Sequence, residues 1–186
     1  IEVEDPALTV RFRSRAREKT FYLAWTTTPW TLPSNVALAV GAEIPYVVVD
    51  DKEDGNSYIL AEARVGLYWR SSETYAIRER VPGAALEGET YEPLFPYFAA
   101  KEAEGAFRIH TADFVATDEG TGIVHIAPGC GAEDFELGRQ LGLPAIAPLD
   151  ENGRFVEGFD WLSGRDALEV AGEVIADLER RGVLYR

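Results

Sequence analysis

The chain has 186 residues, of which 46% are hydrophobic and 27% charged, a composition typical of a globular domain that can bury a core. Its 32 acidic and 18 basic residues give a net charge of −14, which opposes non-specific nucleic-acid binding because such binding depends on Lys and Arg. No apolar stretch approaches the roughly 20 residues that span a bilayer, and the single cysteine excludes an internal disulfide. These features favour the cytoplasm, and the lack of methionine leads us to expect a fragment of a longer enzyme.

Short strands dominate the first 61 residues, where β-branched and aromatic residues partly alternate with polar ones. Pro29 and Pro33 bracket a rigid loop, because each proline fixes its own φ and restricts the residue before it. The close spacing of the strands indicates a meander or a barrel rather than a doubly wound sheet. The expected strands are Leu8–Phe12, Thr20–Trp25, Val36–Val40, Tyr46–Asp50 and Ser57–Ala61.

The remaining sequence predicts further strands and a few helices. We expect a short helix within Ala61–Trp69, a second helix over Glu133–Leu141, and a longer C-terminal helix with Ser163 as its N-cap and Gly182 after its end. The fold class is therefore mostly β with α: a β-barrel core with short helices and one longer C-terminal helix, forming a single domain over residues 1–186. The further strands are Tyr75–Val81, Thr121–Ala127, Ala145–Leu149 and Phe107–Ala116, the last as one strand or as two broken near Ala112–Asp113.

Basic residues alternate along one short segment between the first two expected strands. A solvated hairpin face is the favoured interpretation, and a patch that contacts phosphate is the alternative. The residues are Arg11, Arg13, Arg15, Arg17 and Lys19.

Three consecutive threonines, Thr26, Thr27 and Thr28, follow Trp25 and precede Pro29-Trp30. They could simply end an edge strand. Alternatively, they form a polar wall, because hydroxyl groups both donate and accept hydrogen bonds and can hold a water and an ester together. The flanking tryptophans would then offer flat apolar surface to a nucleoside or a side chain.

A second unusual stretch places His125 near the end of an apolar strand and Asp134 in the first turn of the following helix. By default His125 is a core histidine and Asp134 a helix-start carboxylate. Cys130 as a nucleophile with His125 as its base lacks supporting residues. A metal site formed by His125, Cys130 and Glu133 lacks the ligand spacing typical of zinc, so we expect neither a metal nor another cofactor.

Together these stretches resemble the editing domain of isoleucyl-tRNA synthetase, the connective-peptide insertion shared in outline with the valyl and leucyl enzymes. The resemblance rests on Trp-Thr-Thr-Thr-Pro-Trp-Thr-Leu-Pro at 25–33, Gly-Thr-Gly-Ile-Val-His-Ile-Ala-Pro at 120–128 and Gly-x-x-Asp-Phe at 131–135. It covers essentially the whole chain. Ser34 departs from it, since glycine is common there in the family. The His-x-Gly-His and Lys-Met-Ser-Lys-Ser signatures of the synthetase's catalytic core are absent, so we expect no aminoacylation.

The resemblance implies a function and a role for each residue. The domain would proofread by hydrolysing misactivated valine, as Val-tRNA(Ile) or valyl-adenylate, and its partners would be the 3′ end of the mischarged tRNA and the rest of the synthetase. Asp134 would hold the α-ammonium group of valine, and the three threonines would orient the ester and the attacking water. His125 would exclude the additional methyl of isoleucine, and Trp25 would contact the adenosine or the valyl group. The alternative is a barrel without catalysis that docks tRNA or a neighbouring domain.

Overall fold

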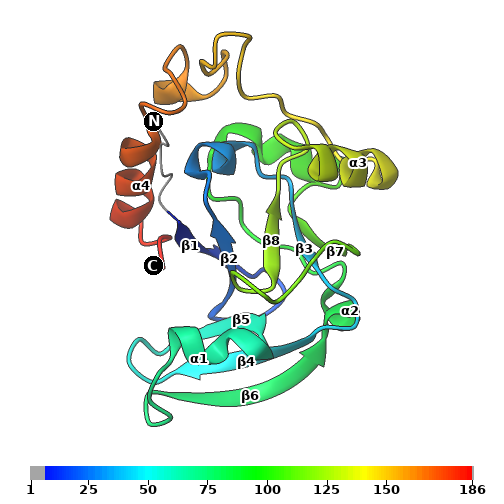
Figure 1. Ribbon diagram of the computed structural model, residues 1–186, viewed down its shortest axis with the longest axis vertical. Coiled ribbons are helices and arrows are strands. Elements are labelled where there is room, and N and C mark those ends of the chain that lie inside the picture. The colour runs from blue at the N-terminus through cyan, green and yellow to red at the C-terminus, as the bar shows by residue number, and fades with distance from the viewer. Residues whose placement is uncertain (1–6, 186) are drawn as a thin grey trace.

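One curled sheet forms the centre of the fold in residues 7–185, the part of the chain that this computed structural model describes. Eight strands form one mixed sheet in the order β6-β4-β5-β2-β8-β3-β7, with β1 added against β2 (Figure 1). The sheet curls into a half-barrel, which confirms the predicted β-rich core decorated by short helices. The strands are β1 (Leu8–Arg13), β2 (Thr20–Thr26), β3 (Ala37–Val40), β4 (Pro45–Asp51), β5 (Ser57–Ala61), β6 (Tyr75–Pro82), β7 (Arg108–Thr111) and β8 (Ile123–Ile126).

Strand β2 is the point at which the sheet forks. One edge of β2 pairs with β1 along its whole length, in antiparallel register from Leu8 opposite Thr26 to Arg13 opposite Phe21. On the other edge, the first residues of β2 pair in parallel with β5, whereas Trp25 pairs in parallel with Val124 of β8. The end of β2 therefore leaves β5 and runs beside β8.

Short helices connect and cover the strands. The predicted helix after β8 is present as α3, and it ends where Gly142 adopts the left-handed φ of 68°. The segment between the two prolines is a 3-10 helix, η1, rather than a loop. The helical segments are η1 (Pro29–Ser34), η2 (Glu62–Arg64), α1 (Val65–Tyr68), α2 (Gly83–Leu86), η3 (Pro96–Glu104), α3 (Ala132–Leu141), η4 (Asp160–Leu162) and α4 (Ala171–Arg180).

Two predictions for the last 45 residues are wrong. The C-terminal helix α4 begins at Ala171 and not after Ser163, because the Ser163 hydroxyl accepts the Phe159 N–H in the turn around η4. The expected strand Ala145–Leu149 is reduced to one bridge between Leu149 and Phe155. The expected strand Phe107–Ala116 likewise shortens to β7.

Hydrophobic residues fill both faces of the sheet around β2. The larger cluster includes Phe12, Tyr22 and Val174, so α4 covers it. The chain after α4 bonds along β1, with Leu184 opposite Val10. A smaller cluster lies on the other face between β4, β5 and α1. No helix within residues 7–185 is both long and apolar enough to cross a membrane.

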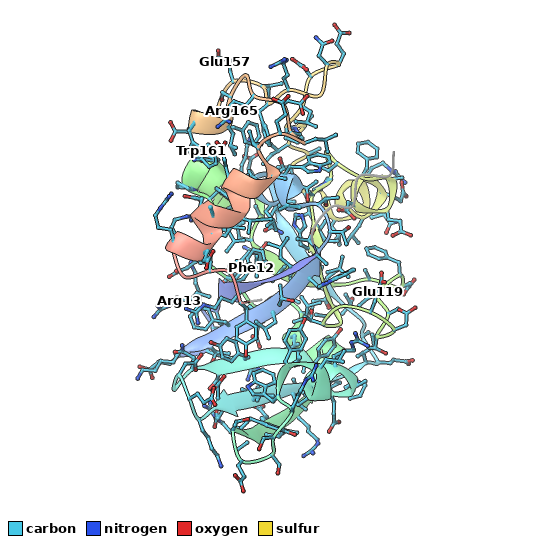
Figure 2. The ribbon with its side chains drawn as sticks, turned by 60° about the vertical axis from the view of Figure 1, so that its left-hand side comes forward. Phe12, Arg13, Glu119, Glu157, Trp161 and Arg165 are labelled. Carbon is cyan, nitrogen blue, oxygen red and sulfur yellow. The ribbon has the colours of Figure 1, made fainter. Side chains whose placement is uncertain are left out.

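The basic segment is mostly committed to contacts within the chain. Arg17 bonds to Glu79 and Glu89, and the guanidinium of Arg11 stacks 4.4 Å above the ring of Phe21. Arg13 is exposed, in contrast to its buried neighbour Phe12 (Figure 2). This arrangement agrees with a hairpin face, the favoured interpretation.

Candidate active site

The two unusual stretches meet because the strands that precede them are parallel neighbours. Trp25 near the end of β2 pairs with Val124 in β8. Parallel strands end at the same edge of a sheet, so the residues that follow them lie together, and such edges are common places for ligand sites. Thr26 ends one strand and Thr27 and Thr28 follow it, and the start of α3 follows the other strand (Figure 1).

A cavity of about 380 Å³ opens at this edge. Its walls include Trp25, Thr26, Thr27 and Asp134, so one hollow contains four of the six side chains that the resemblance singles out. Thr27 is exposed, Trp25 and Asp134 are half-buried, and Thr26 is buried. Phe114, Ala116, Glu133 and residues 118–124 complete the lining.

Asp134 is oriented by a backbone contact. Its Oδ2 accepts a hydrogen bond of 2.9 Å from the N–H of Ala127, the residue just after β8. Burial raises the pKa of the Asp134 carboxyl, the Ala127 amide partly opposes this rise, and the nearby charge of Glu133 adds to it. The carboxylate is thus fixed in direction while it remains part of the cavity wall.

The cavity carries negative charge only. Asp118, Glu119, Glu133 and Asp134 line it, whereas none of its lining residues is Lys, Arg or His. Glu119 stands on the loop that precedes β8 (Figure 2). A carboxylate in a half-buried position binds an ammonium group through charge-assisted hydrogen bonds, so this cavity suits a cationic group.

Thr28 and His125 do not line this cavity but belong to a layer behind it. Thr31 connects them: its hydroxyl donates to the carbonyl of Thr28 at 2.8 Å, and its Oγ1 lies 2.8 Å from His125 Nε2. His125 contacts Thr31 and is not among the residues that line this cavity, so its role as the wall that excludes isoleucine stays a prediction.

The protonation of His125 follows from this network. The amide nitrogen of Asn35, which can only donate, lies 2.9 Å from Nδ1, so Nδ1 accepts and Nε2 carries the proton that it gives to Thr31. Tyr91 donates to the Asn35 oxygen and so fixes the orientation of that amide. Burial lowers the pKa of His125 to about 4, which leaves the ring neutral at pH 7. The ring is a support for the threonines and cannot serve as a base for the cavity.

Sequence reasoning missed Thr31 and Asn35 as members of the site. Both are buried polar residues in or next to η1, at 6% and 5% exposure, and both bond to His125. The signal was present, since a threonine, a serine and an asparagine lie among the apolar residues after Trp30.

Cys130 has the wrong environment for a nucleophile. Burial raises the pKa of its thiol to about 11, and the charge of Asp134 contributes to that rise. Both nitrogens of His125 are bonded elsewhere, so the proposed base is not available to it. Among residues 7–185, no group of three or more His, Cys, Asp and Glu side chains is placed to hold a metal ion.

Comparison with known proteins relates the whole chain to a segment of larger ones, although no family model matches it. It is 43% identical over 185 residues to isoleucine–tRNA ligase of Bdellovibrio bacteriovorus, covering 99% of this chain and 18% of that protein. Identity is 42% over 189 residues with the isoleucine–tRNA ligase of Tetrahymena thermophila, covering 98% and 17%. It is 39% over 192 residues with the cytoplasmic isoleucine–tRNA ligase of Schizosaccharomyces pombe, covering 100% and 18%. The chain thus spans less than a fifth of the length of these relatives.

Solved structures give the same picture for the fold. The crystal structure of GlLeuRS-CP1 matches with a TM-score of 0.75 at 11% identity, covering 97% of this chain and 98% of that one. The P. knowlesi cytosolic leucyl-tRNA synthetase editing domain matches with a TM-score of 0.69 at 10% identity, covering 99% and 97%. At these identities the likeness concerns the fold alone.

Proposed function

The chain belongs with the isoleucine–tRNA ligases as a homologue of one segment of them and has the fold of a synthetase editing domain, and from this premise we propose that it hydrolyses misactivated valine. The proposed substrates are the 3′ end of Val-tRNA(Ile) and valyl-adenylate. The reaction uses water and needs no cofactor.

Residues 1–186 act, in this proposal, as one editing domain within a longer cytoplasmic synthetase. The small share of each relative that the chain covers supports the longer enzyme, and the name of the S. pombe relative supports the compartment. The rest of the synthetase presents the tRNA end, which is consistent with the net charge of −14 that opposes tRNA binding by this domain alone.

One observation carries the proposal: Thr26, Thr27 and Asp134 line the same cavity although 107 positions separate Thr27 from Asp134 in the sequence. A threonine pair and an ionised carboxylate match the two ends of an aminoacyl ester. The carboxylate takes the α-ammonium group, and the hydroxyl groups face the ester and its attacking water.

The hydrolysis follows from that placement. Water held by the Thr26 and Thr27 hydroxyls attacks the carbonyl carbon. In Val-tRNA(Ile) the bond to the ribose oxygen breaks and the proton lost by water ends on that oxygen, whereas in valyl-adenylate the bond to the phosphate oxygen breaks and AMP leaves. A neighbouring ribose hydroxyl of the substrate assists the proton transfer, because His125 is buried, neutral and fully hydrogen-bonded. Thr28 contributes from behind by fixing the path of the chain between Thr26 and Thr31.

To discriminate between valine and isoleucine, the site must exclude the larger side chain sterically rather than rely on the contact that the smaller side chain lacks. One buried CH₂ group is worth only about 0.8 kcal/mol, less than a factor of ten in binding. A packed wall that must move to admit an extra methyl excludes it more strongly. His125 stiffens such a wall indirectly, by packing behind Thr31 and the threonine segment.

The test compares two esters on the full-length enzyme that contains this chain. We expect Val-tRNA(Ile) to be hydrolysed much faster than Ile-tRNA(Ile), and a non-hydrolysable valyl-adenosine analogue to bind more tightly than its isoleucyl counterpart. A barrel that only docks tRNA would bind both tRNAs and leave both esters intact, and that result would remove the proposal.

A further inference from the structure

The loop of residues 118–122 forms part of the wall of the cavity, together with the threonines and the start of α3. Its backbone is shaped by glycine, since Gly120 has a left-handed φ of 71°. Gly120 also lies directly against Trp25: a Cβ on it would be 3.2 Å from the Trp25 Cβ. This part of the wall is therefore backbone that packs against the Trp25 side chain. The exposed carboxylates of Asp118 and Glu119 lie next to it in the lining of the cavity.

Three hydrogen bonds hold this loop in place, one made by its own Thr121 and two made by side chains that do not line the cavity. The hydroxyl of Thr121 donates to the carbonyl of Leu23 at 2.6 Å, and the buried Tyr46 hydroxyl donates to the carbonyl of Gly122. The carbonyl of Gly120 is held by Arg64, whose Nε donates to it at 2.8 Å. Of these contacts, the Arg64 bond is the one nearest the carboxylates and is made by a half-buried side chain rather than a fully buried one.

We propose that Arg64 is a positioning residue for the hydrolytic site: its guanidinium clamps the Gly120 carbonyl and keeps the loop closed against Trp25. Arg64 is not among the residues lining the cavity, so it acts only through the loop. This inference rests on the proposed function and goes beyond it by assigning a role to a side chain in η2.

The clamp predicts a particular kinetic signature. Thr26, Thr27 and Asp134 belong to other elements, so the groups proposed for the chemistry stay in place when the clamp is lost. A loop that is only part of the time in its closed position lowers the apparent affinity by that fraction. Loss of the clamp should therefore raise KM for the aminoacyl ester and leave kcat nearly unchanged.

Two substitutions of equal length isolate the hydrogen bond. Arg64→Gln keeps an N–H group at the position of Nε, whereas Arg64→Met has no donor there, and both remove the same charge. In the full-length enzyme we expect Arg64→Met to raise KM for Val-tRNA(Ile) about 3- to 10-fold over Arg64→Gln, with kcat within about twofold. Arg70→Met, at an exposed arginine just after α1, is the control for a general loss of charge and should match the unsubstituted enzyme.

Hydrogen exchange gives a second measurement that does not depend on catalysis. The amides of residues 119–122 should exchange faster in Arg64→Met than in Arg64→Gln. Equal exchange in the two variants, equal KM values, or a fall in kcat at constant KM would each overturn the clamp. If the unsubstituted enzyme hydrolyses neither ester, the proposed function fails, and the exchange comparison still decides whether Arg64 holds the loop.

Discussion

Two layers of polar side chains stand one behind the other at this site, and they use their hydrogen-bonding groups differently. The front layer, Thr26, Thr27 and Asp134, lines the cavity, with Thr27 exposed, Asp134 half-buried and Thr26 buried. The rear layer, Thr31, Asn35 and His125, is buried, uncharged and bonded within itself. Groups that keep free hydrogen-bonding capacity can serve a substrate, and groups that use it internally serve the fold. Changes in the front layer should therefore impair hydrolysis, and changes in the rear layer should impair stability.

The largest effect is expected for His125→Ala. The change opens a cavity in the rear layer and leaves the hydrogen-bonding groups of Thr31 and Asn35 without their partner. The free energy of unfolding should fall by about 2–5 kcal/mol, measured by urea denaturation. The packed wall behind the threonines should also move more easily to admit the extra methyl group of isoleucine, so the full-length enzyme would begin to hydrolyse Ile-tRNA(Ile). A variant that is as stable as the parent and as selective would contradict the support role.

The pH dependence of the unfolding free energy should also reveal the burial of His125 in the rear layer. Burial lowers the pKa of His125 to about 4, below the ordinary value of 6.5, so the unfolded chain binds the proton more readily than the folded one. The stabilisation is complete above pH 6.5 and is lost as the pH falls toward 4. This loss amounts to about 3 kcal/mol of unfolding free energy. His125→Gln, which cannot titrate, is the control that removes the contribution of carboxylates, and a parallel pH profile for both proteins would contradict the prediction.

In the front layer, Asp134→Asn should separate activity from stability. The amide oxygen can still accept the Ala127 N–H, but the charge that holds the α-ammonium group is gone. Because burial raises the pKa of the Asp134 carboxyl, its ionised form is a cost to the fold at neutral pH, and the neutral amide removes that cost. Hydrolysis of Val-tRNA(Ile) should fall roughly 10- to 150-fold.

The melting temperature of Asp134→Asn should stay the same or rise, and isoleucine charging should be intact. Glu136→Gln is a matched control, since Glu136 lies on the same helix but is exposed and bonds to Arg139. Unchanged hydrolysis in Asp134→Asn would remove Asp134 from its proposed role.

The sequence predicts the parts of the two layers that depend on local residue patterns, and it does not predict the parts that depend on pairing between distant segments. Short runs of aromatic and aliphatic residues in Thr20–Thr26 and Ser57–Ala61 are enough to identify β2 and β5. The parallel pairing of β2 with β8 joins residues 99 positions apart, and no local pattern encodes it, so it was the resemblance that brought Thr27 and Asp134 together. The bond between His125 and Thr31 was missed because it depends on η1, which places Thr31 against the ring.

Local patterns can also mislead. Ser163 with Asp166 three residues later looks like a helix start, but Asp166 instead accepts the N–H groups of Leu168 and Glu169 in a turn. The helix begins only at Ala171.

A threonine in each layer provides a direct comparison. Thr31→Val removes a hydroxyl that bonds to His125 and to the Thr28 carbonyl, so the free energy of unfolding should fall by about 1–3 kcal/mol. Thr27→Val changes an exposed side chain, and its effect on unfolding should stay within about 0.5 kcal/mol while hydrolysis of Val-tRNA(Ile) slows. Thermal unfolding and ester hydrolysis of both variants decide the matter, and equal stability losses would mean that the two layers are not distinct.

The smallest effect is expected at Cys130, which is near the site by sequence but belongs to neither layer. Burial raises the pKa of its thiol to about 11, so at pH 7 the thiolate that a nucleophile needs is almost absent. His125 cannot generate that thiolate, because its protonated Nε2 is committed to Thr31 and its Nδ1 to Asn35. Cys130→Ala should therefore hydrolyse Val-tRNA(Ile) within about twofold of the parent, the size of change expected when no reacting group is removed. A loss of hundreds-fold, with the fold intact by circular dichroism, would instead make the thiol part of the chemistry and assign the nucleophile to Cys130 rather than to water held by the threonines.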